Sequence, residues 1–334
     1  MATDPRLAAE LRVMTKAERR VLRQLSIAYA QMTRQIRAWE SSSRVGAQVS
    51  AAQARVLQTS LRAQMAAMWR AVGNEVRAGR LEAAQLAQQP SKGVLDYFRA
   101  AGLTPSEVAQ LAESTLAAAE QTVDTALRRM LGESYIPLSD QVWRTQALVD
   151  GRLDTIINTN LLKGVNARQL AQAVRGFVRP DARGGTRYAA NRLARTEINN
   201  AFHAANVSEM QVEPFTTFIQ WHLSGSHPKP DECNQYAEKT HVKGQEAGVY
   251  EKANVPRRPH PNCLCYTTGL TLERDDFIAA FQRGEFDDWL RSKGVDPGPA
   301  LRGGGVTGVQ AQIMENSAYT GKPVGTKPRQ GPAR

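Results

Sequence analysis

The residues best suited to chemistry are three cysteines and two histidines in the last third of the sequence. Cys233 follows His227 by six residues, and a Pro-His-Pro-Asn-Cys-Leu-Cys segment supplies His260, Cys263 and Cys265. Thiolates and imidazoles are ligands that Zn²⁺ prefers, and a closed tetrahedral site needs four of them. The three cysteines with either His227 or His260 would meet this requirement. Zinc is therefore the one cofactor that the sequence suggests.

Two other states of the cysteines stay open at this level. The one-residue gap between Cys263 and Cys265 is shorter than the gap usual between zinc ligands, so the thiols can instead be buried and reduced. A disulfide from Cys233 to Cys263 or Cys265 is the third alternative. An odd number of cysteines without a secretory leader is not typical of a disulfide framework.

A catalytic centre is a weaker interpretation of the same residues. A Cys–His pair can act as nucleophile and base, and zinc with Glu232 can hydrolyse a bond. However, the sequence contains no HExxH, GxSxG or GxxxxGK[ST] motif, and its Gly303-Gly304-Gly305 run has no predicted strand before it or helix after it. We therefore expect a protein that is not an enzyme, with a zinc-dependent nuclease or hydrolase as the alternative.

Long helices precede this region. Apolar residues recur at three- and four-residue steps over 7–39 and again over 57–76, which predicts two amphipathic helices separated by a serine run at 41–43. After a breaker at Pro90, a third helix is predicted from Thr104, an N-cap followed by proline, to Met130. Residues 1–135 are thus expected to form an elongated helical bundle, either as a simple core or as a docking arm for an oligomeric ring.

The next part, residues 136–296, is predicted to mix helices with a little sheet. Three helices are expected, over 136–161, 167–178 and 187–210, and the second of them opens with a capping box of Asn166 and Gln169. The β-branched and aromatic run from Phe215 to Leu223 predicts a strand. A loop to Thr268 and one or two short helices over 271–290 would follow. The fold class is therefore mainly α with a small α+β module near the C-terminus.

The chain is strongly basic, with a formal net charge of +11. Excess positive charge favours binding to polyanions without specifying a sequence. Residues 297–334 are rich in Gly and Pro, so we expect a flexible basic tail. Its cations, the predicted nucleic-acid contacts, are Arg302, Lys322, Lys327, Arg329 and Arg334. No apolar run is long enough to span a bilayer, and the chain starts on charged residues, so a cytoplasmic protein without a membrane partner is expected.

One further motif, Arg195-Thr196-Glu197, lies within the predicted helix 187–210. Arg195 and Glu197 are two residues apart and cannot face each other on a helix. They are expected either to bond to the cysteine-rich segment or to be solvated. His203, on the same helix, is predicted to be a packed or exposed histidine and not a ligand.

The order of these motifs resembles a known family. A helix with Arg-Thr-Glu-x-x-x-Ala is followed by a strand that ends at Trp221, then by Ser-x-x-His-Pro-Lys-Pro-Asp-x-Cys, which contains Asp231, and finally by Pro-His-Pro-Asn-Cys-x-Cys. Over roughly residues 138–268 the chain is similar to the Mu F-like phage head morphogenesis domain, and the last segment is the most specific part. That family often has a second cysteine where this chain has Tyr236, so here a histidine would have to complete any metal shell.

The resemblance implies a minor head protein of a tailed phage, present in few copies at the portal vertex and needed for head assembly and DNA packaging or ejection. Its implied partners are the portal oligomer, major capsid or scaffold proteins, and packaged double-stranded DNA held without sequence preference. Its implied location is the virion, with the host cytoplasm during assembly. A DNA-binding, toxin-like module is a further alternative.

Overall fold

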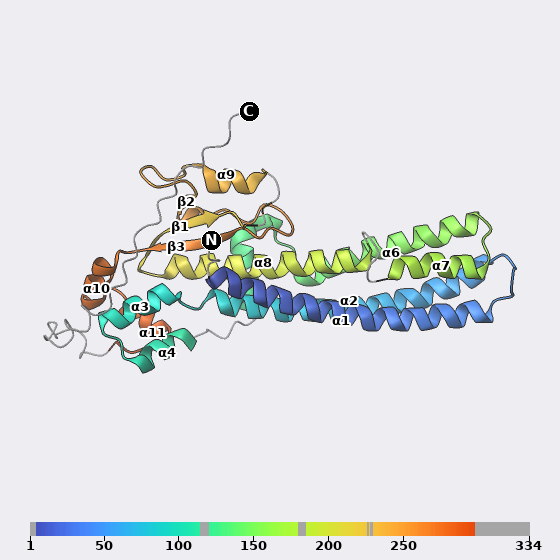
Figure 1. The fold of residues 1–334 in the computed structure, drawn as a ribbon, viewed down its shortest axis with the longest axis horizontal. Coiled ribbons are helices and arrows are strands. Elements are labelled where there is room, and N and C mark those ends of the chain that lie inside the picture. Colours follow the sequence, from blue (N-terminus) through green and yellow to red (C-terminus); the bar gives the residue numbers. More distant parts are fainter. Residues whose placement is uncertain (1–4, 114–119, 180–184, 226, 228–229, 298–334) are drawn as a thin grey trace, which may run out of the picture.

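The fold is a rod of long helices with a small sheet and a helical cluster at one end (Figure 1). The computed structural model describes residues 5–113, 120–179, 185–225, 227 and 230–297. The predicted class, mainly α with a small α+β module, is confirmed. The tail cations Arg302, Lys322, Lys327, Arg329 and Arg334 lie outside the described residues.

The rod begins with an antiparallel hairpin of α1 (Pro5–Ser42) and α2 (Ala51–Ala87). Ser50 caps α2, because its side chain accepts the Gln53 N–H while the Gln53 side chain accepts the Ser50 N–H. The apolar stripes predicted for both helices are buried along the seam; Val21, Met32 and Leu61 are examples. The amphipathic pattern therefore identified both helices and the faces on which they pack.

Four more helices share the core of this hairpin: α5 (Glu120–Leu131), α6 (Leu138–Leu162), α7 (Ala167–Val178) and α8 (Thr186–Val212). Helices α1, α2 and α8 meet closely at Gly79, where an added Cβ would lie 2.6 Å from Ile198 Cδ1 and 3.0 Å from Ala17 Cβ. The boundary predicted between residues 135 and 136 therefore falls inside one continuous hydrophobic core.

The helix predicted from Thr104 to Met130 corresponds to two elements, α4 (Pro105–Glu113) and α5. Leu111 of α4 is buried in one hydrophobic core and Leu127 of α5 in another, so only α5 packs in the core of the rod. Residues 114–119 of the predicted helix lie outside the described residues. Packing partners from distant segments decide this arrangement, and the apolar period alone does not reveal them.

The second core lies at the sheet end of the rod and joins α3 (Lys92–Ala101) and α4 to α10 (Arg274–Gln282) and α11 (Asp287–Ser292). Phe98 is at its centre. The Phe98 ring stacks on Trp289 at a centroid distance of 5.7 Å and meets Phe277 edge-on at 4.9 Å. Aromatic pairs of this kind add to the burial of apolar area.

A three-stranded antiparallel sheet covers the C-terminal half of α8 (Figure 1). Its order is β2 (Val249–Glu251), β1 (Thr216–His222), β3 (Tyr266–Thr271). The predicted strand, β1, is confirmed. The loop predicted as far as Thr268 is wrong in part, since it contains α9 (Glu232–Glu238), β2, a 3₁₀ turn (Lys252–Asn254) and the start of β3. A second 3₁₀ turn, Gly132–Ser134, follows α5.

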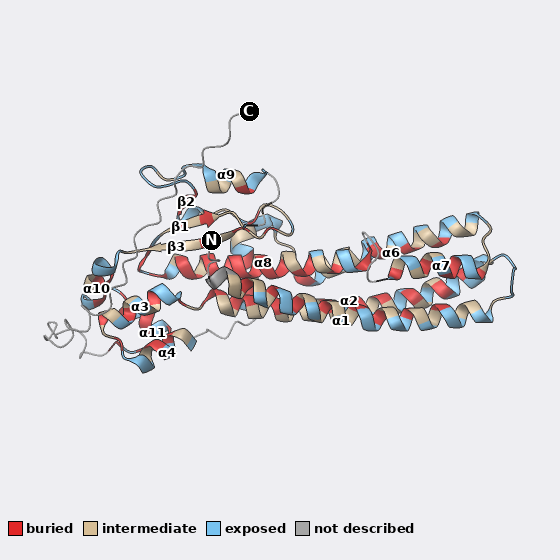
Figure 2. Ribbon diagram, in the orientation of Figure 1, coloured by how far each residue is buried: buried red, intermediate tan, exposed pale blue. Residues whose placement is uncertain are grey.

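Helix α8 differs from the other rod helices in its burial. Figure 2 shows buried residues around much of α8 beneath the sheet, whereas α1 buries a stripe. Glu197, Asn199 and His203 are among the buried positions of α8. One side of this helix packs in the rod and the other side supports the sheet module.

Candidate metal centre

The sheet brings the predicted ligands together from three segments. His227 follows β1, Cys233 lies in the first turn of α9, and the segment with His260, Cys263 and Cys265 leads into β3. Because β1 and β3 are neighbours in the sheet, the residues after one strand and before the other lie at the same edge. The convergence expected for these five residues is found.

The ligand atoms form two groups of three, and within each group the distances suit a metal ion. Cys233 Sγ is 3.6 Å from Cys263 Sγ and 3.4 Å from His260 Nε2, and Cys265 Sγ is 3.8 Å from His227 Nδ1. Two groups, one of His227, Cys233 and Cys265 and one of Cys233, His260 and Cys263, have all their ligand atoms within 4.8 Å of one another. Bonds of about 2.3 Å to sulfur and about 2.0 Å to nitrogen imply tetrahedral edges of roughly 3.5–3.8 Å. The residues therefore fit a His/Cys metal-binding group.

Each imidazole has one ring nitrogen beside a sulfur, and His260 Nε2 also lies 3.0 Å from Asp231 Oδ2. The His260 Nδ1–H donates to the Pro261 carbonyl at 3.1 Å, which leaves Nε2 beside Cys233. His227 Nε2 faces the Asn234 Oδ1 at 2.9 Å and Asp231 Oδ1 at 3.4 Å, so its Nδ1 is the nitrogen beside Cys265. A carboxylate or amide oxygen behind a ligating histidine fixes its ring and tautomer.

Asp231, a motif residue in the sequence, organises this segment from both its oxygens. Its Oδ1 accepts the Cys233 N–H at 2.7 Å as the N-cap of α9, and its Oδ2 is 3.0 Å from His260 Nε2. Burial acts to raise the pKa of Asp231, but the Cys233 N–H and the two nearby imidazoles lower it. Asp231 is therefore an anion that orients a thiol and two histidines.

The three thiols have unequal proton affinities. Burial, together with the neighbouring Cys263, raises the pKa of the Cys233 thiol to about 12. A hydrogen bond from Cys265 lowers the pKa of Cys263 to about 5, with help from the Arg258 guanidinium, and raises the pKa of Cys265. Cys263 therefore has the lowest pKa of the three thiols. A bound divalent cation would favour deprotonation of the others.

All three cysteines are free and almost fully buried, at most 2% exposed. Cys233 and Cys263 form no disulfide in this structure. Reduced buried thiols and metal ligands share this geometry, and each group of three donors has the spacing of metal ligands.

The interpretation of the Arg-Thr-Glu motif needs correction at two of its three residues. Arg195 forms an ion pair with Glu18 of α1, and Glu197 is buried with its carboxylate 4.0 Å from Arg80 of α2. Residues two apart on a helix point in different directions, and here one points to α1 and the other to α2, so both have their ionic partners in the rod. Burial raises the pKa of Glu197, and Arg80 opposes this.

Thr196 is the motif residue that contacts the cluster. Its hydroxyl accepts the backbone N–H of Asn262 at 3.3 Å. Asn262 has φ of 60°, a left-handed conformation that asparagine tolerates, and it turns the chain between His260 and Cys263. Thr196 therefore anchors the turn that carries two of the candidate ligands.

A row of polar side chains on α8, not predicted from the sequence, also holds this segment. Asn199 donates to the Cys263 carbonyl at 3.0 Å, and Asn206 donates to the Thr267 carbonyl at 3.1 Å. Between them, the His203 Nε2–H donates to the Pro256 carbonyl at 3.0 Å. The spacing i, i+4, i+7 places the three side chains on one helix face. Polar residues at this spacing within an alanine-rich helix are the sequence feature that could have predicted these contacts.

A buried ion pair ties the same loop to the start of the chain. Arg258 Nη2 donates to Glu10 Oε1 of α1 at 3.0 Å, and Nη1 donates to the Cys263 carbonyl at 2.6 Å. The side chains of Arg258 and Glu10 are only 2% and 4% exposed. Nothing in the local sequence around either residue indicates this pairing across 248 positions.

Trp221, the last motif residue, packs beneath the cluster. Its ring meets His203 edge-on at 5.4 Å and Tyr236 at 5.3 Å. Its backbone N–H donates to the Gly248 carbonyl at 2.8 Å. Gly248 has φ of 77°, and an added Cβ would lie 2.8 Å from the Ala237 carbonyl oxygen, so glycine is required there.

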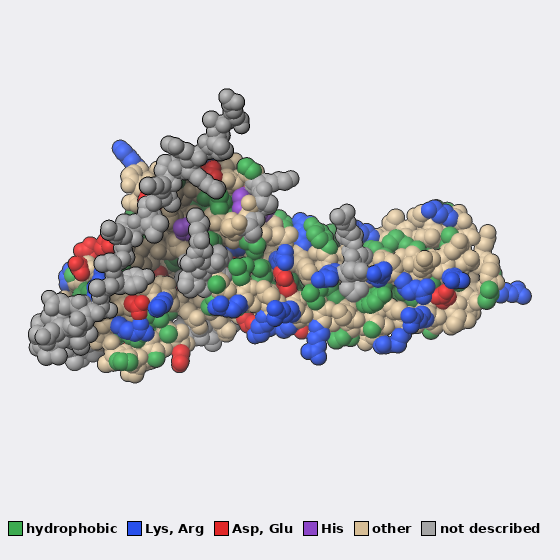
Figure 3. Space-filling view, viewed as in Figure 1, with side chains coloured by type: hydrophobic (Ala, Val, Ile, Leu, Met, Phe, Trp, Pro, Cys, Tyr) green, Lys and Arg blue, Asp and Glu red, His purple; other side chains and the backbone are tan. Residues whose placement is uncertain are grey.

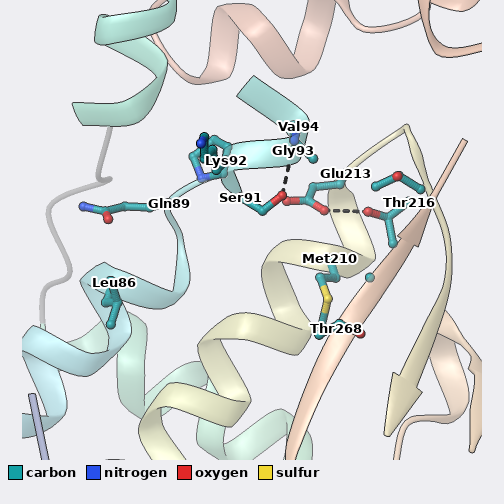
Figure 4. A pocket seen from close by; sticks show the side chains of 13 residues that line it. Leu86, Gln89, Ser91, Lys92, Gly93, Val94, Met210, Glu213, Thr216 and Thr268 are labelled. Atoms are coloured by element: carbon teal, nitrogen blue, oxygen red, sulfur yellow. Dashed lines mark hydrogen bonds between the residues drawn. The ribbon is translucent and has the colours of Figure 1, made fainter. Parts of the chain in front are cut away.

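A cavity of about 480 Å³ lies elsewhere, between the end of α2, the start of α3, the end of α8 and the sheet (Figure 4). Glu213 accepts a hydrogen bond from Thr216 at 2.6 Å, and the Ser91 hydroxyl caps α3 by accepting the Val94 N–H. These polar groups serve the local structure. None of the five candidate ligands lines the cavity.

No described helix combines the length and the apolar composition needed to cross a membrane. Comparisons of the chain with protein-family models, curated proteins and solved structures gave no match.

The burial of His203 predicts a loss of stability in acid. Burial lowers its pKa to about 3 from an ordinary 6.5, with Arg258 acting in the same direction. Below pH 6.5 the unfolded chain therefore binds a proton at this residue that the folded chain does not bind. The free energy of unfolding then falls by about 1.4 kcal/mol for each pH unit. Between pH 7 and pH 5 this residue should remove about 2 kcal/mol of the free energy of unfolding. Urea denaturation of wild type and His203→Gln at both pH values checks this, since the variant should lose that part of the pH dependence. An unchanged pH dependence would contradict it.

The buried Glu10–Arg258 pair predicts that removal of one partner destabilises the protein more than removal of both. Arg258→Met should lower the free energy of unfolding by about 3–5 kcal/mol, because it leaves the Glu10 carboxylate buried without its guanidinium. The double variant Glu10→Met/Arg258→Met should cost less than the single one. Arg283→Met, at an ion pair with Glu285 that is more than half exposed, is the control and should change stability by less than about 0.5 kcal/mol. A double variant at least as unstable as Arg258→Met would show that the pair is not what holds the loop.

Proposed function

We propose that the chain is a structural protein of a tailed-phage head, a minor capsid component at the portal vertex that takes part in head assembly and in DNA packaging or ejection. The observation that carries this proposal is the gathering of the motif residues into one buried cluster. Thr196, Asp231 and Trp221 contact or support the segments that carry the thiols. The resemblance of these motifs to the Mu F-like domain then supplies the function.

The burial of the cluster favours a structural role over catalysis. A catalytic zinc keeps one coordination position open and has three protein ligands, whereas a structural zinc is enclosed by four. Here the candidate donors form two groups that share Cys233, and the three thiols are buried, so an ion bound through the thiols would be enclosed by protein. This supports a non-enzymatic module over a zinc-dependent nuclease or hydrolase.

We propose Zn²⁺ as the ion for this group. Three thiolates and one imidazole are a donor set typical of structural zinc, and softer sulfur ligands disfavour Mg²⁺ and Ca²⁺. When bound, the ion would supply a cross-link between α9 and the segment before β3. His227 and His260 compete for the fourth position, since each lies beside a different sulfur.

The zinc assignment predicts about one zinc per chain in protein purified without chelator, measured by elemental mass spectrometry. Cys233→Ser and Cys263→Ser should each abolish zinc binding, because two thiols and one histidine would leave only three donors. His227→Ala and His260→Ala identify the fourth ligand. His241→Ala, a histidine that stacks on Tyr250 outside the cluster, is the matched control. Absence of stoichiometric zinc from the wild-type protein would end the assignment.

The rod supports the proposed contact with the portal ring. Its free end is formed by the α1–α2 and α6–α7 connections, which are joined by the Val49 N–H to Val165 carbonyl hydrogen bond of 3.1 Å (Figure 1). Two apolar side chains at this end, Val45 and Leu162, are 99% and 91% exposed. Burial of these apolar side chains by a partner would be favourable.

The proposal predicts that the full chain co-purifies with the portal oligomer of the same phage, and with heads at a copy number far below that of the coat protein. Val45→Asp/Leu162→Asp should reduce the recovered complex at least about tenfold, a loss of roughly 1.4 kcal/mol or more. Leu148→Asp/Val212→Asp, which alters two other exposed apolar residues, is the matched control and should not. Failure of the wild-type protein to associate with portal or heads would contradict the proposed function.

A further inference from the structure

One side of α1 carries a straight line of cations. Arg12, Arg19, Arg23, Arg34 and Arg37, here called the arginine line, are all exposed. At about 100° per residue they fall within a sector of roughly 60° around the helix axis, and they extend along it for roughly 38 Å. The line therefore runs along more than half of α1 as one narrow stripe.

The charge of the arginine line is not compensated within the described part of the chain. Residues 12–39 contain seven basic residues and a single acidic one, Glu18, which forms its ion pair with Arg195. No described carboxylate forms an ion pair with any member of the line. Lys16 lies in the same sector but is bonded to Glu82 at 3.1 Å. Figure 3 shows basic side chains along the rod with few acidic ones among them.

We infer that the arginine line binds the phosphate backbone of double-stranded DNA, without reading the bases. The line has two groups, Arg12–Arg23 and Arg34–Arg37, separated by about 16 Å of helix. The residues on this side between them, such as Ser26 and Ala30, are too short to reach base edges. Flexible arginines on either side of this gap can reach the two backbones that flank a major groove about 12 Å wide. Phosphate contacts of this kind position a duplex but do not specify its sequence.

Other polyanions fit this surface less well. An interfacial helix inserts its apolar face into lipid, but the apolar face of α1, with Val21 and Ile36, is already buried in the rod. The centre of a protein–protein interface is usually apolar and aromatic, whereas the arginine line has only a half-exposed Ile27 between its two groups. Evenly repeated phosphates match a linear, purely cationic surface.

This inference deepens the proposed function, on which it rests for the identity of the DNA as packaged genome. It assigns DNA contact to the rod, independently of the basic tail. The two assignments therefore make different predictions for variants of equal net charge.

The test is binding of the full chain to a 30-base-pair duplex of arbitrary sequence, followed by fluorescence anisotropy from 50 to 200 mM salt. Three variants each replace five cations with Gln. The first changes the arginine line. The second changes five exposed arginines scattered over α2, α6, α7 and α8: Arg55, Arg70, Arg144, Arg168 and Arg187. The third changes the five cations of the tail: Arg302, Lys322, Lys327, Arg329 and Arg334. Circular dichroism and thermal melting check that each variant is folded.

Five phosphate contacts correspond to a slope of about −4.5 in log K against log salt, or a loss of affinity of about 500-fold over this range. The line variant should reduce the magnitude of the slope by about 4–5, and the scattered and tail variants by less than about 1. Equal effects of the line and scattered variants would show that only net charge matters, and an effect confined to the tail variant would move the contact there; either result overturns the inference. So does preference for vesicles with 30% anionic lipid over the duplex.

The portal experiment separates this inference from the proposed function. Portal association that survives in the line variant, together with unaltered DNA binding, would reject the arginine line and leave the head-protein proposal standing. DNA binding through the line without any portal or head association would reject the head-protein proposal and leave the DNA surface standing.

Discussion

Helix α8 is buried on two opposite sides, and its polar side chains on the module side must find partners there. Asn199, His203 and Asn206 would each lose water on burial, and a buried polar group without a partner costs about 1–3 kcal/mol. The irregular segment before β3 supplies backbone carbonyls to Asn199 and His203, and Thr267 of β3 supplies one to Asn206. That segment has few ladder bonds of its own, so its carbonyls need these donors as much as the side chains need acceptors. The path of the chain through Cys263 follows from this mutual requirement.

The ligand cluster is a consequence of the same constraint. Once Thr196 and Asn199 hold the turn at Asn262 and Cys263, the pairing of β1 with β3 brings His227 and α9 alongside. Arg258 then joins this turn to Glu10 at the start of α1. Because metal binding to preformed ligands is coupled to folding, an ion at the cluster would stabilise the contact between module and rod as well as the module itself.

The two ends of the molecule suit different tasks. The sheet end is held by buried charges, aromatic packing and the thiol cluster, which favour one rigid arrangement. The rod projects from it with exposed arginines along α1 and two exposed apolar residues at its free end. A base with an extended arm suits the proposed role, in which the chain connects an oligomeric ring to a polyanion.

Sequence patterns alone predicted the long helices, their buried stripes, the capping box at Asn166, the strand β1 and the candidate ligand residues, since each depends on residues within a turn or two of one another. Only the tertiary structure decided that Arg195 and Glu197 face the rod, that α4 and α5 belong to different cores, and that β2 and β3 complete the sheet. The same holds for Glu10 and Arg258, which are 248 positions apart. Such pairings depend on which surfaces meet after folding, and local periodicity and propensity carry no information about that choice.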